Sequence, residues 1–120
     1  MKLERATPVL RILDEAKARQ FYLDFLGFSV DFEARFHDGA PIYMRISRDE
    51  VSILLSEHHG DGTPGTHVMI AMRGLDEFHA ELIGKKYKYM RPHIQKQEWG
   101  TREMYAIDPF GNRLVFSEPI

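Results

Sequence analysis

Two kinds of hydrophobic periodicity divide the first part of the chain into a helix and a strand. Five apolar residues after Asp14 recur at the spacing of one helix face: Ala18, Phe21, Tyr22, Phe25 and Leu26. Asp14 is placed to cap the first turn of this helix, and Gly27 is placed to end it. Apolar and polar residues then alternate from position 28 to 36, which predicts a half-buried strand.

Further strands are predicted on either side of these elements. Residues 7–13 are apolar and β-prone, and they precede the helix. Two more strands, at 41–47 and 51–57, are separated from their neighbours by short polar turns. The first half of the chain, residues 7–57, is therefore expected to have the order β-α-β-β-β.

The same order recurs after a polar, glycine-rich linker at 58–65. The predicted elements are a strand, a helix and three strands, at 66–73, 75–86, 88–93, 98–107 and 113–117. Leu26-Gly27 after the first helix is matched by Ile83-Gly84, 57 positions later. Modules of this size are too small to be stable alone. We therefore expect one domain over 1–120, in which modules at about 7–57 and 66–118 share a core and face each other across a cleft.

Composition narrows the classes of function. A chain of 120 residues with 43% hydrophobic residues and a formal net charge of −2 suits one globular domain, without a field that attracts nucleic acid or anionic lipid. The absence of cysteine excludes disulfides, thiolate metal sites and a cysteine nucleophile, and it suits a cytosolic protein. No signal-peptide pattern or membrane-length apolar run is present. We expect a cytoplasmic protein with a small-molecule ligand or a second copy of itself as partner, and with neither nucleic acid nor membrane.

Two stretches carry a resemblance to a known family. FYLDFLGF occupies 21–28 and DPFGNRLVF occupies 108–116. With the repeated order of elements, they resemble the glyoxalase, bleomycin-resistance and extradiol-dioxygenase (vicinal oxygen chelate) superfamily, over about Pro8 to Glu118. The run at 73–77 and the pair Trp99-Gly100 are similar to the bleomycin-resistance branch. The resemblance implies an α+β fold of two βαβββ modules, whose strands form a curved mixed sheet, a half-barrel around a ligand or metal.

The resemblance also implies four positions for metal ligands, on the first, fourth, fifth and eighth strands. In this sequence they hold Thr7, Leu54, His67 and Val115. Only His67 binds a divalent metal well, and a functional site normally needs at least three good protein ligands. We therefore expect no metal and no cofactor. His67 then has three interpretations: a remnant of the metal site, a hydrogen-bonding group for a ligand, or an interior histidine with its hydrogen bonds satisfied.

Strand parity extends these positions to a whole cleft surface. If Leu54, His67 and Val115 face the cleft, period-two alternation brings nine further residues to the same side: Arg11, Tyr43, Arg45, Ser52, Ser56, Met69, Ala71, Arg113 and Ser117. Their neighbours in the strands are apolar and are expected to pack under the helices, among them Ile53, Leu55, Leu114 and Phe116. Three arginines in the cleft favour a neutral or anionic ligand.

Trp99 is the only tryptophan and lies beside Gly100 at the entry to the strand predicted at 98–107. In the bleomycin-resistance family, the matching Trp-Gly forms part of a flat slot that an aromatic residue of the partner subunit completes. Phe36 is the nearest match to that aromatic on this chain, with Phe32 as the alternative. The competing interpretation is that Trp99 closes one end of the half-barrel.

Three functions remain in view. The first is a homodimeric bleomycin-resistance-like protein that sequesters a planar aromatic antibiotic or metabolite, without metal or catalysis, and a bleomycin-like molecule is one candidate. Its predicted ligand-binding residues are Trp99, Phe36, Phe32, Tyr43, Arg45, His67, Glu103 and Arg113. The second is a lyase, isomerase or dioxygenase-like enzyme with a non-standard site, in which His67, Tyr43 or Glu103 acts as acid or base. The third is an accessory protein with a vestigial cleft.

Overall fold

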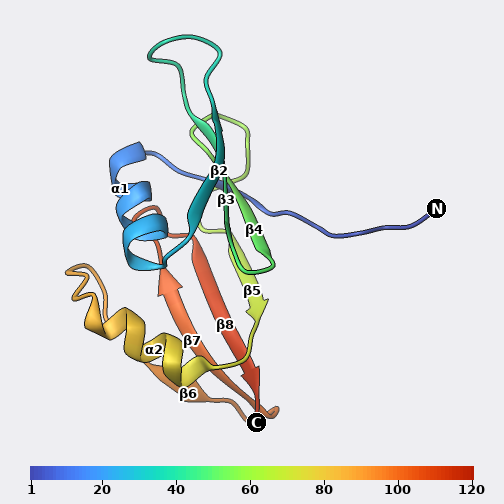
Figure 1. Ribbon diagram of the computed structural model, residues 1–120, viewed down its shortest axis with the longest axis vertical. Helices are drawn as coiled ribbons and strands as arrows, with labels where there is room; N and C mark the ends of the chain where they lie inside the picture. The colour runs from blue at the N-terminus through green and yellow to red at the C-terminus, as the bar shows by residue number, and fades with distance from the viewer.

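Each half of the chain builds one sheet that is backed by one helix (Figure 1). The computed structural model describes residues 1–120. The first half contains β1 (Val9–Arg11), α1 (Glu15–Arg19), a π-helical segment (Gln20–Phe25), β2 (Ser29–Ala34), β3 (Tyr43–Arg48) and β4 (Val51–Ser56). The second half contains β5 (His67–Ala71), α2 (Leu75–Gly84), β6 (Ile94–Lys96), β7 (Thr101–Ile107) and β8 (Arg113–Pro119). The predicted repeat of βαβββ order is thus present.

The two sheets have the same topology. The first sheet has the order β1-β4-β3-β2, and the second has the equivalent order β5-β8-β7-β6. In each, the strand before the helix pairs in parallel with the last strand of its half, and the other pairs are antiparallel. The fold is therefore α+β with two mixed sheets of four strands.

The first helix begins and ends where the sequence predicts. Asp14 caps it, because its side chain accepts a hydrogen bond of 2.9 Å from the backbone N–H of Lys17. Gly27 follows the helix with φ +78°, a left-handed conformation that glycine adopts without steric cost. Periodicity did not reveal that the last turns are π-helical, because one apolar stripe suits both kinds of turn.

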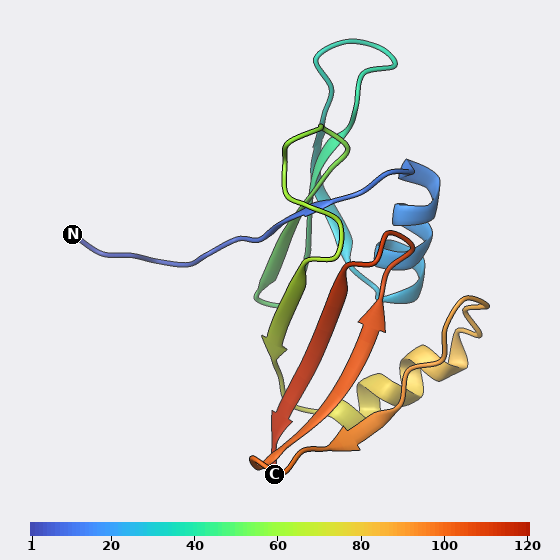
Figure 2. The same cartoon turned by 180° about the vertical axis from the view of Figure 1, so that it is seen from behind.

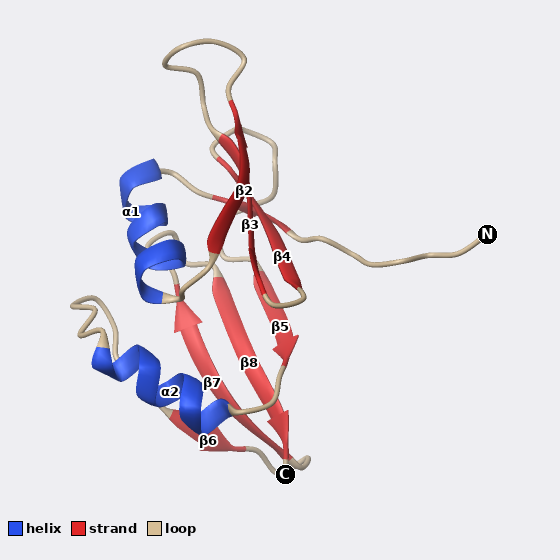
Figure 3. Cartoon of the chain, in the orientation of Figure 1, coloured by secondary structure: helices blue, strands red, loops and turns tan.

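One predicted strand is wrong. Residues 88–93 form an irregular connection after α2, and the sixth strand is instead the short Ile94–Lys96 (Figure 3). Lys86 turns the chain with a positive φ of 54°, and Pro92 lacks the N–H that a sheet ladder requires. His79 on α2 also lies with its Nε2 3.0 Å from the carbonyl oxygen of Pro92, which holds this connection against the helix.

A single core joins the two halves. Twenty-one buried residues from both modules form one hydrophobic cluster. A polar network crosses the same boundary: the Tyr22 hydroxyl donates to Asp108 at 2.6 Å, and the Asn112 amide donates to Asp108 and to the carbonyl of Arg11, both at 2.8 Å. Asp108 and Asn112 are buried, so these contacts satisfy polar groups that would otherwise be costly to bury.

The N-terminal segment extends away from the two sheets and their helices. Residues 1–7 run outward as an extended arm before β1 (Figures 1 and 2), and all but Thr7 are exposed. Leu3 in this arm is 88% exposed. None of the helices is long and apolar enough to cross a membrane.

Candidate functional site

Each sheet has one covered face and one open face. Helices cover the first: Ile53, Leu55 and Leu114 are fully buried there, as strand parity predicts. No element packs against the second face of the C-terminal sheet, which is turned toward the viewer in Figure 2. Met69 is 56% exposed there and Ile107 is 43% exposed. We call the sides that carry Arg45 and Arg113 the open faces of the first and second sheets.

The open face of the first sheet brings together an aromatic pair and an arginine. Phe32 and Arg45 are register partners on β2 and β3, and the rings of Phe32 and Tyr43 lie 6.3 Å apart. Arg45 donates from one terminal nitrogen to the Ser52 hydroxyl at 3.2 Å. Its Nε is buried without a hydrogen-bond partner, and the nearest carboxylate oxygen, of Asp31, is 3.6 Å away. Three of the predicted ligand-binding residues therefore lie side by side.

The open face of the second sheet carries a second cationic group. His67 and Arg113 are direct partners in the parallel β5–β8 pair, and both are exposed. The Arg113 guanidinium carbon lies 5.3 Å from the centroid of the Tyr105 ring, a cation–π contact. Val115, the next open-face residue on β8, is 1% exposed and packs between its partners Met69 and Tyr105.

Glu103 is the buried carboxylate of the same face. It is 4% exposed, and both of its hydrogen bonds fall on Oε2, from Thr101 at 3.0 Å and from Ser117 at 3.4 Å. Two hydroxyl donors partly replace the water that a buried carboxylate loses. Its register partner on β6 is Gln95, so no cation faces it within the sheet.

The two predicted stacking aromatics are far apart in the chain's own fold. Phe36 lies in the β2–β3 connection at one end of the molecule, and Trp99 lies in the β6–β7 connection at the other (Figures 1 and 2). Phe36 is 88% exposed and Trp99 is 70% exposed. The Phe36 ring meets the His58 ring edge-on, at 5.5 Å between centroids. A single chain therefore does not assemble a slot from these two rings.

The metal positions of the resembled superfamily do not fit a metal here. Leu54 and Val115 offer no donor atom, and Thr7 offers only a hydroxyl. No group of three or more His, Cys, Asp or Glu side chains converges anywhere in the chain. His67 is exposed beside Arg113, so it is not an interior histidine with satisfied hydrogen bonds, and the corresponding interpretation is wrong.

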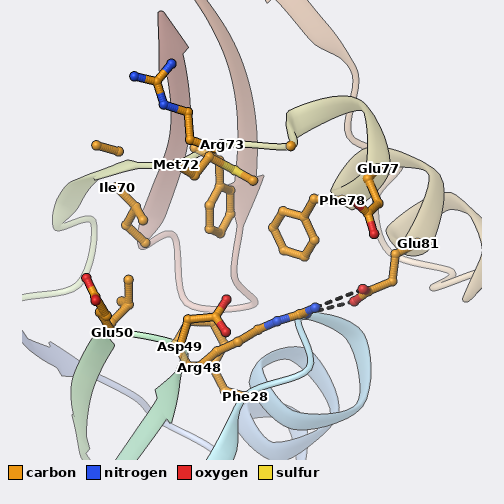
Figure 4. Close-up of a pocket in the computed structure, with 14 residues that line it drawn as sticks. Phe28, Arg48, Asp49, Glu50, Ile70, Met72, Arg73, Glu77, Phe78 and Glu81 are labelled. Carbon is orange, nitrogen blue, oxygen red and sulfur yellow. Dashed lines mark hydrogen bonds and ion pairs between the residues drawn. The ribbon is translucent and has the colours of Figure 1, made fainter.

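Two large cavities lie elsewhere, between the modules. The first, of about 640 Å³, is lined by the β3–β4 turn, the end of β5 and the start of α2 (Figure 4). Arg48 spans it and donates two hydrogen bonds to Glu81, at 2.7 and 2.8 Å, which lowers the pKa of the Glu81 carboxyl. The second, of about 750 Å³, lies between the N-terminal arm, β4 and β5. None of the eight predicted ligand-binding residues lines either cavity.

Sequence reasoning overlooked two residues of the open faces. Tyr105 holds Arg113 in place, and Asp31 is the carboxylate nearest to Arg45. Parity with Glu103 along the seventh strand could have identified Tyr105. Asp31 could not be found in that way, because the pairing of β2 with β3 shifts register between Val30 and Phe32.

A family model and several solved structures match this fold. The family model of glyoxalase superfamily proteins matches residues 1–120. Among solved structures, a bleomycin-binding protein from bleomycin-producing Streptomyces verticillus, complexed with copper(II)-bleomycin, is 26% identical over 100% of this chain and 99% of its own, with a TM-score of 0.75. A bleomycin resistance determinant encoded on the transposon Tn5 is 24% identical over 98% of both chains, with a TM-score of 0.75.

Enzymes and binding proteins share this fold. A glyoxalase-related enzyme from Clostridium phytofermentans is 23% identical over 100% of this chain and 98% of its own, with a TM-score of 0.76. No curated protein is significantly similar in sequence. The neighbours therefore support the half-barrel architecture implied by the resemblance. Whether the protein binds or catalyses has to be argued from the residues of its own site.

Proposed function

Because this chain belongs to the glyoxalase superfamily, we propose that it is a non-catalytic protein that sequesters a planar aromatic small molecule in a cleft completed by a second copy. The binding residues are those of the two open faces, with Trp99 and Phe36 as the stacking rings: Trp99, Phe36, Phe32, Tyr43, Arg45, His67, Glu103 and Arg113. Neither a metal nor a reaction is required, because the ligand is held by mass action.

One observation carries this proposal. Trp99 and Phe36 are exposed aromatic side chains at opposite ends of the molecule, and the sheet beside Trp99 has an uncovered face (Figure 2). Aromatic residues are enriched at the centres of protein interaction sites. A second copy, arranged so that the first sheet of one chain meets the second sheet of the other, would bring a Phe36 ring toward a Trp99 ring.

The chemistry of the relatives supports the ligand class. The Streptomyces verticillus protein binds copper(II)-bleomycin and matches this chain over its full length. The four superfamily metal positions of this chain hold at most one good ligand, which favours binding without metal-assisted chemistry. A protein of this kind would confer resistance by lowering the free concentration of an antibiotic, and it would act inside the cytoplasm.

A lyase or isomerase of the same fold is the second candidate, and Glu103 is the observation that favours it. Its Oε1 has no hydrogen-bond partner, although the residue is only 4% exposed. A carboxylate that two hydroxyl groups hold in place, with its second oxygen free to accept a proton, is suited to general acid–base catalysis. His67 and Tyr43 would be the other acid–base groups, but neither is hydrogen-bonded to Glu103.

Fluorescence of the single tryptophan tests the binding proposal directly. We expect copper(II)-bleomycin or a neutral flat aromatic, 2-naphthamide, to quench Trp99 saturably, with one ligand per chain and a dimer by analytical ultracentrifugation. By calorimetry, Trp99→Ala should weaken binding by about tenfold, because stacking and burial are lost together. Tyr89→Ala is the matched control, since Tyr89 is 61% exposed but packs on Tyr87 away from the open faces.

Three outcomes would contradict the proposal. Binding that is unchanged in Trp99→Ala would remove the stacking role. A monomer that still binds ligand at full stoichiometry would remove the second copy from the site. Conversion of a bound ligand, detected by mass spectrometry and abolished in Glu103→Gln, would establish the enzyme instead.

A further inference from the structure

We propose that the sequestered ligand is an aromatic acid, whose anionic group binds the guanidinium of Arg113 while Arg45 supplies a second positive charge to the cleft. This inference rests on the proposed function, because it names the chemical class of ligand for the same site. It extends that function, since neither the fold nor the relatives' ligands specify the charge of a molecule bound here.

The arginines on the covered sides and on the open faces of the sheets differ in how their charges are met. On the covered sides, four arginines have carboxylate partners within hydrogen-bond distance: Arg19, Arg35, Arg48 and Arg102. On the open faces, Arg113 forms no ion pair, and Arg45 reaches Asp31 only at 3.6 Å. Buried Nε atoms without a hydrogen-bond partner occur in this chain only in Arg45 and Arg11, both on the open face of the first sheet. Both arginines with an unpartnered buried Nε thus lie on the open face of the first sheet, and Arg113, without an ion pair, lies on that of the second.

The Arg113 side chain is preorganised to bind an anion. Its guanidinium lies over the Tyr105 ring at 5.3 Å, which restricts the side chain and leaves its N–H edges free. His67 is its direct neighbour across the β5–β8 pair and is a further hydrogen-bond donor at the same position. A planar guanidinium forms two parallel hydrogen bonds with a carboxylate, which gives both affinity and orientation.

Most carboxylates on or beside these faces are engaged by hydroxyl groups, and Asp61 accepts a hydrogen bond of 2.9 Å from the Ser56 hydroxyl. Glu103 is 4% exposed and is engaged by the hydroxyls of Thr101 and Ser117. Asp31 is shared with the Ser47 hydroxyl, at 2.9 Å, as well as with Arg45. Glu98 is exposed next to Trp99, and it is the one free carboxylate beside the stacking ring. Cationic ligands would therefore meet unpaired arginines, whereas an acid would satisfy them.

The ligand must combine the acid with a flat ring. Phe32 and Tyr43 lie beside Arg45, and Tyr105 lies beneath Arg113, so each arginine stands next to an aromatic surface. A carboxylate attached directly to an aromatic ring is coplanar with it and matches this arrangement. Aromatic carboxylic acids are accordingly the class that we infer.

Three ligands of one shape and different charge provide the test: 2-naphthoate, 2-naphthamide and 2-naphthylmethylammonium. Calorimetric titration of the intact protein should give an affinity for 2-naphthoate at least about tenfold above that for the amide, because a charge-assisted pair is gained. The ammonium compound should bind more weakly than the amide. Added salt should weaken binding of the acid and leave binding of the amide unchanged.

Substitutions then locate the acid group. In Arg113→Gln we expect the affinity for 2-naphthoate to fall to that of the amide, and in Arg45→Gln to fall by less, while the affinity for the amide persists in both. Arg113→Lys should recover part of the preference, because it restores the charge without the planar fork. Arg91→Gln is the control, since Arg91 is exposed and lies on the α2–β6 connection.

The results separate this inference from the proposed function. Equal affinities for the three compounds, with binding still lost in Trp99→Ala, would overturn the acidic ligand and leave the sequestering function intact. A preference that survives both arginine substitutions would overturn the assignment to these residues. Absence of binding by all three compounds would overturn the inference, and a parallel titration with copper(II)-bleomycin would then decide whether the sequestering function stands.

Discussion

Leu54 and Leu55 are consecutive residues of β4, and they lie on opposite faces of the first sheet. Leu55 is fully buried in the common core, whereas Leu54 is partly exposed between Val9 and Arg45 on the open face. The same division holds in the second sheet, where Leu114 is buried and Arg113 is exposed. Alternate positions of one strand thus differ in role: the covered face stabilises the fold, and the open face carries the residues proposed to recognise a ligand or a second copy.

The largest predicted effect comes from the covered face. Leu55→Ala should lower the free energy of unfolding by about 3 kcal/mol, because it removes buried methyl groups and leaves a cavity. Leu54→Ala is the matched control and should cost less than about 1 kcal/mol. Urea unfolding at one protein concentration compares the two. Equal losses would show that the open face is as tightly packed as the core.

The second-largest loss of stability is predicted for the polar network between the modules. Tyr22→Phe removes the donor to Asp108 from a fully buried site and should cost about 1–2 kcal/mol. Burial, and then the Asp108 charge, raise the pKa of the Tyr22 hydroxyl well above its usual 10.0. The wild type retains that proton when folded, so the contribution of Tyr22 to stability should be constant below pH 10 and should fall as pH rises above it.

A comparison of the wild type with Tyr22→Phe assigns the loss of stability at alkaline pH to this residue. Tyr22→Phe has no hydroxyl to ionise at this position, so its stability should fall less steeply above pH 10 than that of the wild type. Thermal or urea unfolding across the alkaline range measures both slopes. Parallel curves would contradict a buried, protonated Tyr22.

A smaller effect is expected for the ion pair that spans the cavity in Figure 4. Arg48 lowers the pKa of the Glu81 carboxyl below its usual 4.5, so the pair contributes stability above that pH and loses it as the pH falls through the lowered pKa. Both side chains are about one-third exposed, and water screens them. Glu81→Gln should cost about 0.5 kcal/mol at neutral pH, and the difference from the wild type should vanish in acid, as urea unfolding would measure.

The smallest change in stability is predicted for the residue with the most specific proposed role. Arg113→Gln should shift the free energy of unfolding by no more than about 0.5 kcal/mol, because the side chain is exposed and forms no ion pair. The same substitution should abolish the preference for 2-naphthoate. A large loss of stability would instead place Arg113 among the residues that hold the fold together.

Much of the fold was accessible from local patterns. Capping by Asp14, the turn at Gly27 and the alternation of burial in β3 all depend on residues close in sequence, and the structure confirms them. Burial does not alternate along β2, which is almost entirely exposed, or at positions 114–116 of β8, which are all buried. The strand predicted at 88–93 failed for a long-range reason. His79 on α2 contacts Pro92, so the connection follows the helix and pairing with β7 begins only at Ile94.

The candidate site divides in the same way. Parity along β5 and β8 predicted that His67 and Arg113 share a face, because side chains alternate regardless of what the sheet packs against. It could not predict that Arg113 lies over Tyr105, or that both hydrogen bonds of Glu103 fall on one oxygen. Those contacts depend on which strands are neighbours and on their register.

By itself, the sequence determined the repeated βαβββ order, the apolar positions of the core and the residue types available for recognition, because hydrophobic periodicity and capping act over a few residues. Only the tertiary structure decided where those residues lie relative to one another. It placed Phe36 and Trp99 at opposite ends of the molecule, and it left one face of the second sheet uncovered (Figure 2). It also left Arg45 and Arg113 without a hydrogen-bonded carboxylate. The physical reason is that pairing of distant strands and packing of helices on one side determine which charges are satisfied, and no local pattern contains that information.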